Sequence, residues 1–422
     1  MIKIALFGLL AALMLFPTEG AQAQLRLPSG IGGLPDLGRA LRDDGLLRRQ
    51  LDSALAPLNL QGLGDQLLAQ HPRELTRNAA GELIVRHQLL ALPASNAARE
   101  RLLALPEVAL IEETQLDGLD ISWLLLRAEV GLLPRLRALD PEGTYDYQHL
   151  YLGSGEVGSA SATPHPTGAE ATTSSARVGL IDSGVDVQHP SLRRSNVQRH
   201  GCGGTAYPAA HGTAVASLLV GNDGGTFRGA LPGATLYAAD AYCDAADGGS
   251  VQAIAQSLAW LARERVGVIN ISLVGPPNAL LQRAVAAAQS KGHLIVAAVG
   301  NDGPAAAPLY PAAWPGVVAV TGVDARRRVL AEAGRGPHVA LAAPGSEMVG
   351  AGRSKDYVAL RGTSFAAPLV AGLLAARLPQ ADVAGAAEAL AALRNQAIDL
   401  GAAGRDDVYG WGLVGEALRN KP

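Results

Sequence analysis

Three side chains of the types used in nucleophilic acyl transfer follow short apolar runs in the later part of the chain. Asp182 closes the run VGLI, His211 begins HGTAVASLL, and Ser364 lies in GTSFAAP at the start of a helical pattern. A serine hydroxyl is a weak nucleophile that needs an adjacent base; an imidazole can serve as that base, and a carboxylate can orient the imidazole. Each residue also has an ordinary structural interpretation, as a turn cap, a structural histidine and a helix N-cap.

The elements that must position these side chains alternate regularly from Arg177 onward. Helical stretches cover 250–263, 278–290 and 364–377, and the strand-like runs are RVGLID, TLYAADAY, GVINISLV, HLIVAAVGN, VVAVTGVD and HVALAAPG. Such alternation is typical of a parallel sheet with helices on both faces, whose ligands bind beyond the carboxyl ends of the strands. We therefore predict an α/β fold with a doubly wound sheet over 177–422.

The N-terminal region carries an export signal and little else that is recognisable. Lys3, the apolar run 4–16 and Ala21-Gln22-Ala23 fit a signal peptide over 1–23, cut after Ala23. The alternative is a membrane anchor, which the short run disfavours. Segment 24–80 is expected to be a linker or weakly structured. We expect a periplasmic or secreted protein with no stable membrane insertion.

The region 81–152 has the rhythm of a small α+β domain. Its patterns follow the order β-α-β-β-α-β, which is that of a ferredoxin-like fold. Segment 153–176 is composed mostly of Gly, Ser, Thr, Ala and Pro, so we expect a flexible linker that separates this domain from the larger one.

The charge and the cysteine content indicate which partners, cross-links and metal sites to expect. The net charge of −3 gives no sign of a nucleic-acid partner. Cys202 and Cys243 are the only cysteines, and in an oxidising compartment they suggest a disulfide closing about 41 residues; two separate buried thiols are the alternative. No zinc site is expected. Asn222 and Asp223 are too few oxygens for calcium, so we assign no metal and no cofactor.

The three blocks LIDSGVDVQHP, HGTAVASLLVG and GTSFAAPLVAG resemble, in order and spacing, the signatures of the subtilisin-like serine proteases. The chain order Asp, His, Ser is that of the subtilisin-type triad. The resemblance covers 177–415. It implies a serine endopeptidase in which Ser364 is the nucleophile, His211 the general base and acid, and Asp182 the orienting carboxylate.

The same resemblance implies further site residues. Asn301, directly after a strand, corresponds to the family's side-chain oxyanion donor, although an Asn before Asp-Gly is also a common turn former. Family substrates lie as an extended strand between two strand-like edges. ISLVGPP matches one edge and supplies Leu273, Val274 and Gly275. Leu309 falls where many members carry glycine, which predicts a shallow pocket for the residue before the scissile bond.

The resemblance also implies how the protein is made and with what it interacts. Many members carry a ferredoxin-like propeptide that acts as an intramolecular inhibitor with its C-terminal end in the active-site cleft, and 81–152 has the expected size and place. We therefore expect self-cleavage within Tyr151–Ala176. The expected partners are peptide or protein substrates and the chain's own propeptide, with the enzyme a monomer. Two rival functions are a non-catalytic binding protein on this fold and an enzyme that joins peptides.

Overall fold

A computed structural model describes residues 60–164, 176–352 and 355–421. The chain divides into two units, Met1–Ser53 and Ala54–Pro422, and all described residues belong to the second. The predicted signal peptide over 1–23 lies outside the described residues, as does segment 24–59. Among the helices that the structure describes, none is long and apolar enough to cross a membrane.

A small antiparallel domain occupies residues 75–149. Its sheet has the order β1-β2-β4-β3, with β5 also paired to β2. From β2 to β5 the element order is the predicted β-α-β-β-α-β, and its helices pack on the sheet through a cluster that includes Leu102, Leu126 and Leu136. The elements are β1 (Leu75–Arg77), β2 (Leu83–Leu92), α5 (Asn96–Leu103), β3 (Ala109–Leu116), β4 (Ile121–Arg127), the 3-10 helix η2 (Val130–Leu132), α6 (Leu133–Leu139) and β5 (Thr144–His149).

Two segments expected without regular structure contain some. Segment 24–80 includes α4 (Leu60–Gln70) and strand β1. The predicted linker 153–176 begins with β6 (Leu152–Gly153) and β7 (Glu156–Ala162), which pair with strands of the larger domain. Small residues do not prevent this pairing, because an edge strand is held by backbone hydrogen bonds that any residue except proline can donate.

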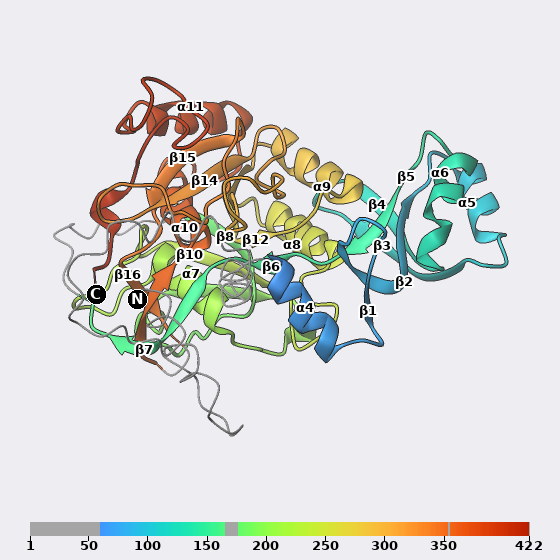
Figure 1. Cartoon of the computed structure of the whole chain (residues 1–422), viewed down its shortest axis with the longest axis horizontal. Coiled ribbons are helices and arrows are strands. Elements are labelled where there is room, and N and C mark those ends of the chain that lie inside the picture. The colour runs from blue at the N-terminus through green and yellow to red at the C-terminus, as the bar shows by residue number, and fades with distance from the viewer. Residues whose placement is uncertain (1–59, 165–175, 353–354, 422) are drawn as a thin grey trace, which may run out of the picture. The chain divides into compact units, whose positions relative to one another are not determined.

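The large domain is built on a seven-stranded parallel sheet (Figure 1). Its order is β15-β14-β13-β11-β8-β10-β9, so the first strand in the chain, β8, lies inside the sheet, and later strands are added on both sides of it. The predicted doubly wound fold is confirmed, and the reversal of direction beside β8 marks the expected place of a ligand site. The strands are β8 (Arg177–Asp182), β9 (Asn196–His200), β10 (Thr235–Asp240), β11 (Val268–Ile271), β13 (Leu294–Ala298), β14 (Val318–Val323) and β15 (Val339–Pro344).

Alternate side chains of these strands enter two separate cores. Val178 and Leu180 pack in the cluster that contains α7 (Ala210–Val220) and α10 (Thr363–Ala375), whereas Ile181 packs with α8 (Val251–Arg263) and α9 (Ala279–Ser290). Because neighbouring residues of a strand point to opposite faces, each face has its own pair of helices. The remaining elements are the two-residue β12 (Leu273–Val274), β16 (Met348–Ala351), β17 (Tyr357–Arg361), α11 (Val383–Arg394) and the 3-10 helices η3 (Cys202–Gly204) and η4 (Glu416–Leu418).

Candidate active site

The structure places Asp182 and His211 in direct contact. Asp182 ends β8 and His211 is the second residue of α7; His211 Nδ1 lies 2.8 Å and 3.1 Å from the two Asp182 carboxylate oxygens. The Asp182 side chain is fully buried. Burial disfavours the imidazolium, but the charge and hydrogen bond of Asp182 outweigh burial, so the pKa of His211 is raised above its ordinary value. A neighbour, Ser183, donates its backbone N–H to the Asp182 carboxylate at 2.7 Å.

Ser364 is the second residue of α10, where the partial positive charge of the helix favours an anion. Gly362, which caps this helix, has a φ of 137°, and a Cβ there would lie 2.6 Å from the Gly155 Cα, so only glycine fits. Pro368, inside the helix, has no N–H for the Ser364 carbonyl four residues earlier. That carbonyl instead accepts a hydrogen bond from the Ser272 hydroxyl at 3.0 Å.

Asn301 presents an unused donor beside this helix start. Its Oδ1 accepts the Thr363 N–H at 3.1 Å, which fixes the orientation of the amide. Its Nδ2 is buried and donates to none of the residues that the structure describes. The same Nδ2 and the Ser154 carbonyl oxygen both approach the point where a Gly362 Cβ would stand, at 3.0 Å and 3.5 Å. A buried donor in this position suits a developing negative charge on a carbonyl oxygen.

A hydrogen bond between the Ser364 hydroxyl and His211 is not made in this structure. Ser364 Oγ lies 2.9 Å from Ser154 Oγ and donates to the Ser272 carbonyl at 3.3 Å. His211 Nε2 is buried without a partner in the described part of the chain. The three predicted side chains therefore converge on one place, and a segment of the same chain lies between them.

That segment runs through the site as an added strand. Leu152 and Gly153, which form β6, pair antiparallel with Val274 and Leu273 of β12. Gly153 lies against the histidine, since a Cβ on it would be 3.2–3.3 Å from three ring atoms of His211. The following residue, Ser154, is the one beside Ser364. Beyond it, β7 continues antiparallel to β17.

Tyr151, the residue before β6, fills a closed apolar pocket. Its side chain is fully buried, and its hydroxyl donates to the Pro276 carbonyl at 2.6 Å. Gly275 forms one wall, since a Cβ there would lie 2.8 Å from the Tyr151 ring. The predicted residues Leu273, Val274 and Gly275 thus all line the bound segment, the first two by strand pairing and the third by leaving room for the ring.

Leu309 lies beside Gly300, the residue before Asn301. Its Cδ1 is 2.5 Å from the point where a Cβ on Gly300 would stand, and Gly300 directly precedes Asn301. The following residue, Tyr310, exchanges two backbone hydrogen bonds of 3.0 Å with Gly275. The leucine side chain therefore takes up space beside Gly300 that a glycine at position 309 would leave open.

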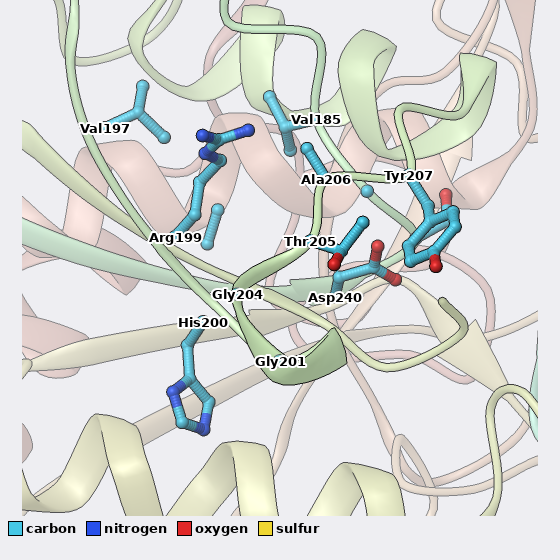
Figure 2. Close-up of a pocket in the computed structure, with 13 residues that line it drawn as sticks. Val185, Val197, Arg199, His200, Gly201, Gly204, Thr205, Ala206, Tyr207 and Asp240 are labelled. Atoms are coloured by element: carbon cyan, nitrogen blue, oxygen red, sulfur yellow. The ribbon is translucent and has the colours of Figure 1, made fainter. Parts of the chain in front are cut away.

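Cys202 and Cys243 form a disulfide with Cα atoms 5.4 Å apart. Next to it is a cavity of about 280 Å³, at one end of which Asp240, Thr205 and Tyr207 lie together (Figure 2). Asp240 Oδ2 is buried with no hydrogen bond to any described residue, and burial raises the pKa of this carboxyl group.

The small domain contacts the N-termini of two helices of the large domain. The Asp146 carboxylate accepts the Ala279 N–H, the first of α9, at 2.8 Å. Asn278, which caps α9, donates to the Tyr147 carbonyl at 2.9 Å. The Gln148 side chain accepts the Gln252 N–H near the start of α8 at 3.2 Å. Acceptors at helix N-termini satisfy N–H groups that have no partner within the helix.

Helix α4 also reaches the site. Leu63, Gln66, Leu67 and Gln70 line a cavity of about 380 Å³ whose other walls include His211, β6 and Tyr242. The first residue of the helix, Leu60, donates its N–H to the Asp302 carboxylate at 2.8 Å, one residue after Asn301.

The comparisons with known proteins identify the family. Residues 173–412, more than half of the chain, match the model of the subtilase family of peptidases. The chain belongs to the subtilase family. Subtilisin Savinase of Lederbergia lenta is 34% identical over 254 residues, which are 58% of this chain and 90% of that protein. This confirms the predicted resemblance and the serine endopeptidase activity that it implies.

Two other matches differ in how much of each chain they cover. Minor extracellular protease Epr of Bacillus subtilis is 32% identical over 247 residues, 56% of this chain, and the match spans only 37% of Epr. The structure of fervidolysin from Fervidobacterium pennivorans, a keratinolytic enzyme related to subtilisin, has a TM-score of 0.68 at 19% identity. It covers 82% of this chain and 62% of that one, and shows a shared fold.

Three residues at the site were not singled out by the sequence. Gly153 and Ser154 lie in a stretch of small residues that looked like a linker, and nothing in their types indicates a strand. Tyr242 does carry a signal, since it is a polar residue just after the end of β10, the kind of position where sheets of this class place functional groups.

Proposed function

We propose that this chain is an exported subtilase made as a precursor, which cuts itself between Ser154 and Gly155. Ser364 is the nucleophile, His211 the general base and then acid, Asp182 the orienting carboxylate, and Asn301 the side-chain oxyanion donor. The observation that carries the proposal is the strand pairing of β6 with β12, which leads directly into Ser154, whose Oγ lies 2.9 Å from Ser364 Oγ.

In the proposed reaction, Ser364 Oγ leaves its contacts with Ser154 Oγ and Ser272 and gives its proton to His211 Nε2. Oγ bonds to the carbonyl carbon of Ser154, and the carbonyl oxygen becomes an oxyanion beside Asn301 Nδ2 and the start of α10. The Ser154–Gly155 bond then breaks as His211 returns the proton to the Gly155 nitrogen. Water hydrolyses the resulting ester by the same proton route, which leaves a new carboxylate on Ser154.

The small domain is proposed to remain as an inhibitor after this cut. Its contacts with α8 and α9 and the buried Tyr151 do not involve the broken bond, so they hold the product in place. Helix α4 adds to this cover on the side of His211. The export of the precursor rests on the signal-like segment 1–23, and the final location is proposed to be the periplasm or the outside of the cell.

The decisive experiment compares the full chain with its Ser364→Ala variant in a protease-deficient host. The wild type is expected as two pieces, the second beginning at Gly155, and the variant as one chain that lacks only the signal segment. N-terminal sequencing identifies the bond. Cleavage of the variant at the same place would show that another protease cuts the linker, and an active wild type that stays intact would refute the precursor scheme.

A serine-directed phosphonate tests the nucleophile separately. It is expected to label Ser364 covalently and to stop hydrolysis of peptides by the matured wild type. Labelling of a different serine, or hydrolysis that survives complete labelling of Ser364, would refute the assigned roles. Ser272→Ala serves as a matched control, because its hydroxyl contacts the Ser364 carbonyl but does not carry the reaction.

A further inference from the structure

The two edges of the bound segment are held in different ways. On one edge, β6 pairs with the backbone of β12. On the other, the Tyr151 N–H donates to the Gly249 carbonyl at 2.8 Å, and the next polar backbone groups of that edge meet a side chain instead of a strand. That side chain is Tyr242.

The Tyr242 hydroxyl makes two hydrogen bonds to this edge. It donates to the Tyr151 carbonyl at 2.6 Å and accepts the Gly153 N–H at 3.1 Å. A phenol has one proton to donate and lone pairs to accept, so both of its roles are used. If Ser154 is the residue before the scissile bond, called P1, then Tyr151 is P4 and Gly153 is P2.

We propose that Tyr242 is a substrate-positioning residue that binds the P4 carbonyl and the P2 N–H of any extended peptide in this cleft. The phenol takes the place of part of the second strand-like edge. It binds backbone groups and so does not select side chains, but it requires an N–H at P2. Peptides with proline or another N-substituted residue at P2 therefore lose one of these bonds.

The turn after β10 holds Tyr242 in this position. Asp240 Oδ1 accepts the backbone N–H groups of Tyr242 and Cys243, at 3.0 Å and 2.9 Å. Cys243 is tied by its disulfide to Cys202, the first residue of η3. The Tyr242 ring lies against Gly249, where a Cβ would be 3.0 Å from Cζ. Asp240 is thus fixed at the end of the cavity in Figure 2 with a structural task, to support this turn.

The phenol keeps its proton while the segment is bound beside it. Burial, and next the nearby Asp182 charge, raise the pKa of Tyr242 far above its ordinary value. At neutral and mildly alkaline pH, where His211 can act as a base, the hydroxyl therefore donates to the Tyr151 carbonyl. Neither of its two hydrogen bonds depends on pH in that range.

This inference rests on the proposed function, because it takes the bound segment as a picture of a substrate. The test uses matured enzyme and two peptides that span Tyr151–Ala162. One has the natural sequence. The other has glycolate in place of the P2 glycine, so that an ester oxygen replaces the N–H. Tyr242→Phe removes the hydroxyl, and Tyr237→Phe is the matched control, because the Tyr237 ring packs on Trp260 and Arg177.

For the natural peptide, Tyr242→Phe is expected to lower kcat/KM by about tenfold, mainly through a higher KM, since each bond is made before the chemical step. Wild type is expected to lose about as much again on the glycolate peptide. The loss on changing glycine to glycolate should be several-fold smaller in Tyr242→Phe, because the acceptor is already gone. The control should behave as wild type on both peptides.

Two results would overturn the inference: equal kcat/KM for wild type and Tyr242→Phe on the natural peptide, or an equal glycolate penalty in both enzymes. If Tyr242→Phe does not mature, an unchanged kcat/KM of wild type on the glycolate peptide overturns it alone. Failure of the proposed function looks different, since wild type would then neither cut the natural peptide nor become labelled at Ser364.

Discussion

Self-cleavage is predicted to depend on Gly153, although this residue takes no part in the chemistry. A Cβ at this position would lie 3.2–3.3 Å from three ring atoms of His211, closer than an ordinary contact. The ring cannot easily turn away, because Asp182 holds Nδ1 at 2.8 Å. The strand cannot easily shift either, because it is paired with β12.

The expected slowing of self-cleavage in Gly153 variants follows from this geometry. In Gly153→Ala, neighbours must move by a few tenths of an ångström, and we expect self-cleavage to slow by about two- to fivefold. Gly153→Val adds two methyl groups to a carbon that is already too close. Overpacking of this kind costs ~1–3 kcal/mol, which corresponds to a rate lower by about 5- to 150-fold. The precursor should therefore accumulate in the order Val, Ala, Gly.

Pulse labelling of the full chain, followed by gel quantification and N-terminal sequencing, gives the rate and the bond. Ser154→Ala is the matched control, since it keeps a small residue beside Ser364 and should be cut at least as fast as wild type. The matured enzyme begins at Gly155 in every case, so any activity that is released must be that of wild type. Cleavage of Gly153→Val at the wild-type rate and at the same bond would refute the placement of Gly153 against His211.

Three other outcomes can be measured on the matured enzyme or on the Ser364→Ala chain. Replacing Cys202 and Cys243 by serine in the Ser364→Ala chain should reduce the free energy of unfolding by about 4 kcal/mol on the chain-entropy model, for a sequence separation of 41 residues, as measured by urea titration; an unchanged midpoint would refute it. The acidic limb of kcat/KM should lie above the ordinary histidine pKa, because His211 acts when neutral and the charge and hydrogen bond of Asp182, which the matured enzyme keeps, raise its pKa; a kcat/KM that does not change between pH 5 and about 9 would contradict a histidine base. Leu309→Gly should improve kcat/KM for Phe over Ala at P1 by about tenfold or more, whereas a wild type that already strongly prefers Phe would exclude Leu309 from that pocket.

The sequence predicts the elements of both domains well where side chains mark them. The run RVGLID is β8 from its first to its last residue, and the run GVINISLV is split into β11 and β12 around Ser272. In the small domain, the alternation of patterns is sufficient to predict the order of the elements, because each element buries one apolar face. Helix α4 is harder to predict, since Gly62 and Gly64 lower its helix propensity.

The residues of the candidate site were predictable, but the conformation of the segment that lies in it was not. Asp182, His211, Ser364 and Asn301 are brought together by the sheet edge on which their strands and helices begin or end. The resemblance implies a propeptide end in the cleft, but the strand over 153–162 was not predictable, because GSGEVGSASA carries no apolar alternation. Its conformation is imposed by β12 and β17, far away in sequence, through backbone pairing that leaves no trace in residue type.

The same contacts explain why one cut would be fast and later release slow. In the proposed scheme, the contacts of the small domain with α8 and α9 and the burial of Tyr151 hold Ser154 in place before the reaction. The attack would then be intramolecular and would need no encounter step. Breaking the Ser154–Gly155 bond removes none of these contacts and none of the hydrogen bonds to Tyr242. It only lets the two pieces separate, and the cost of separation is the sum of the contacts that made the reaction efficient. In the proposed scheme, destruction of the small domain must therefore precede full activity, because binding that is strong enough to position this segment is also strong enough to retain it as a product.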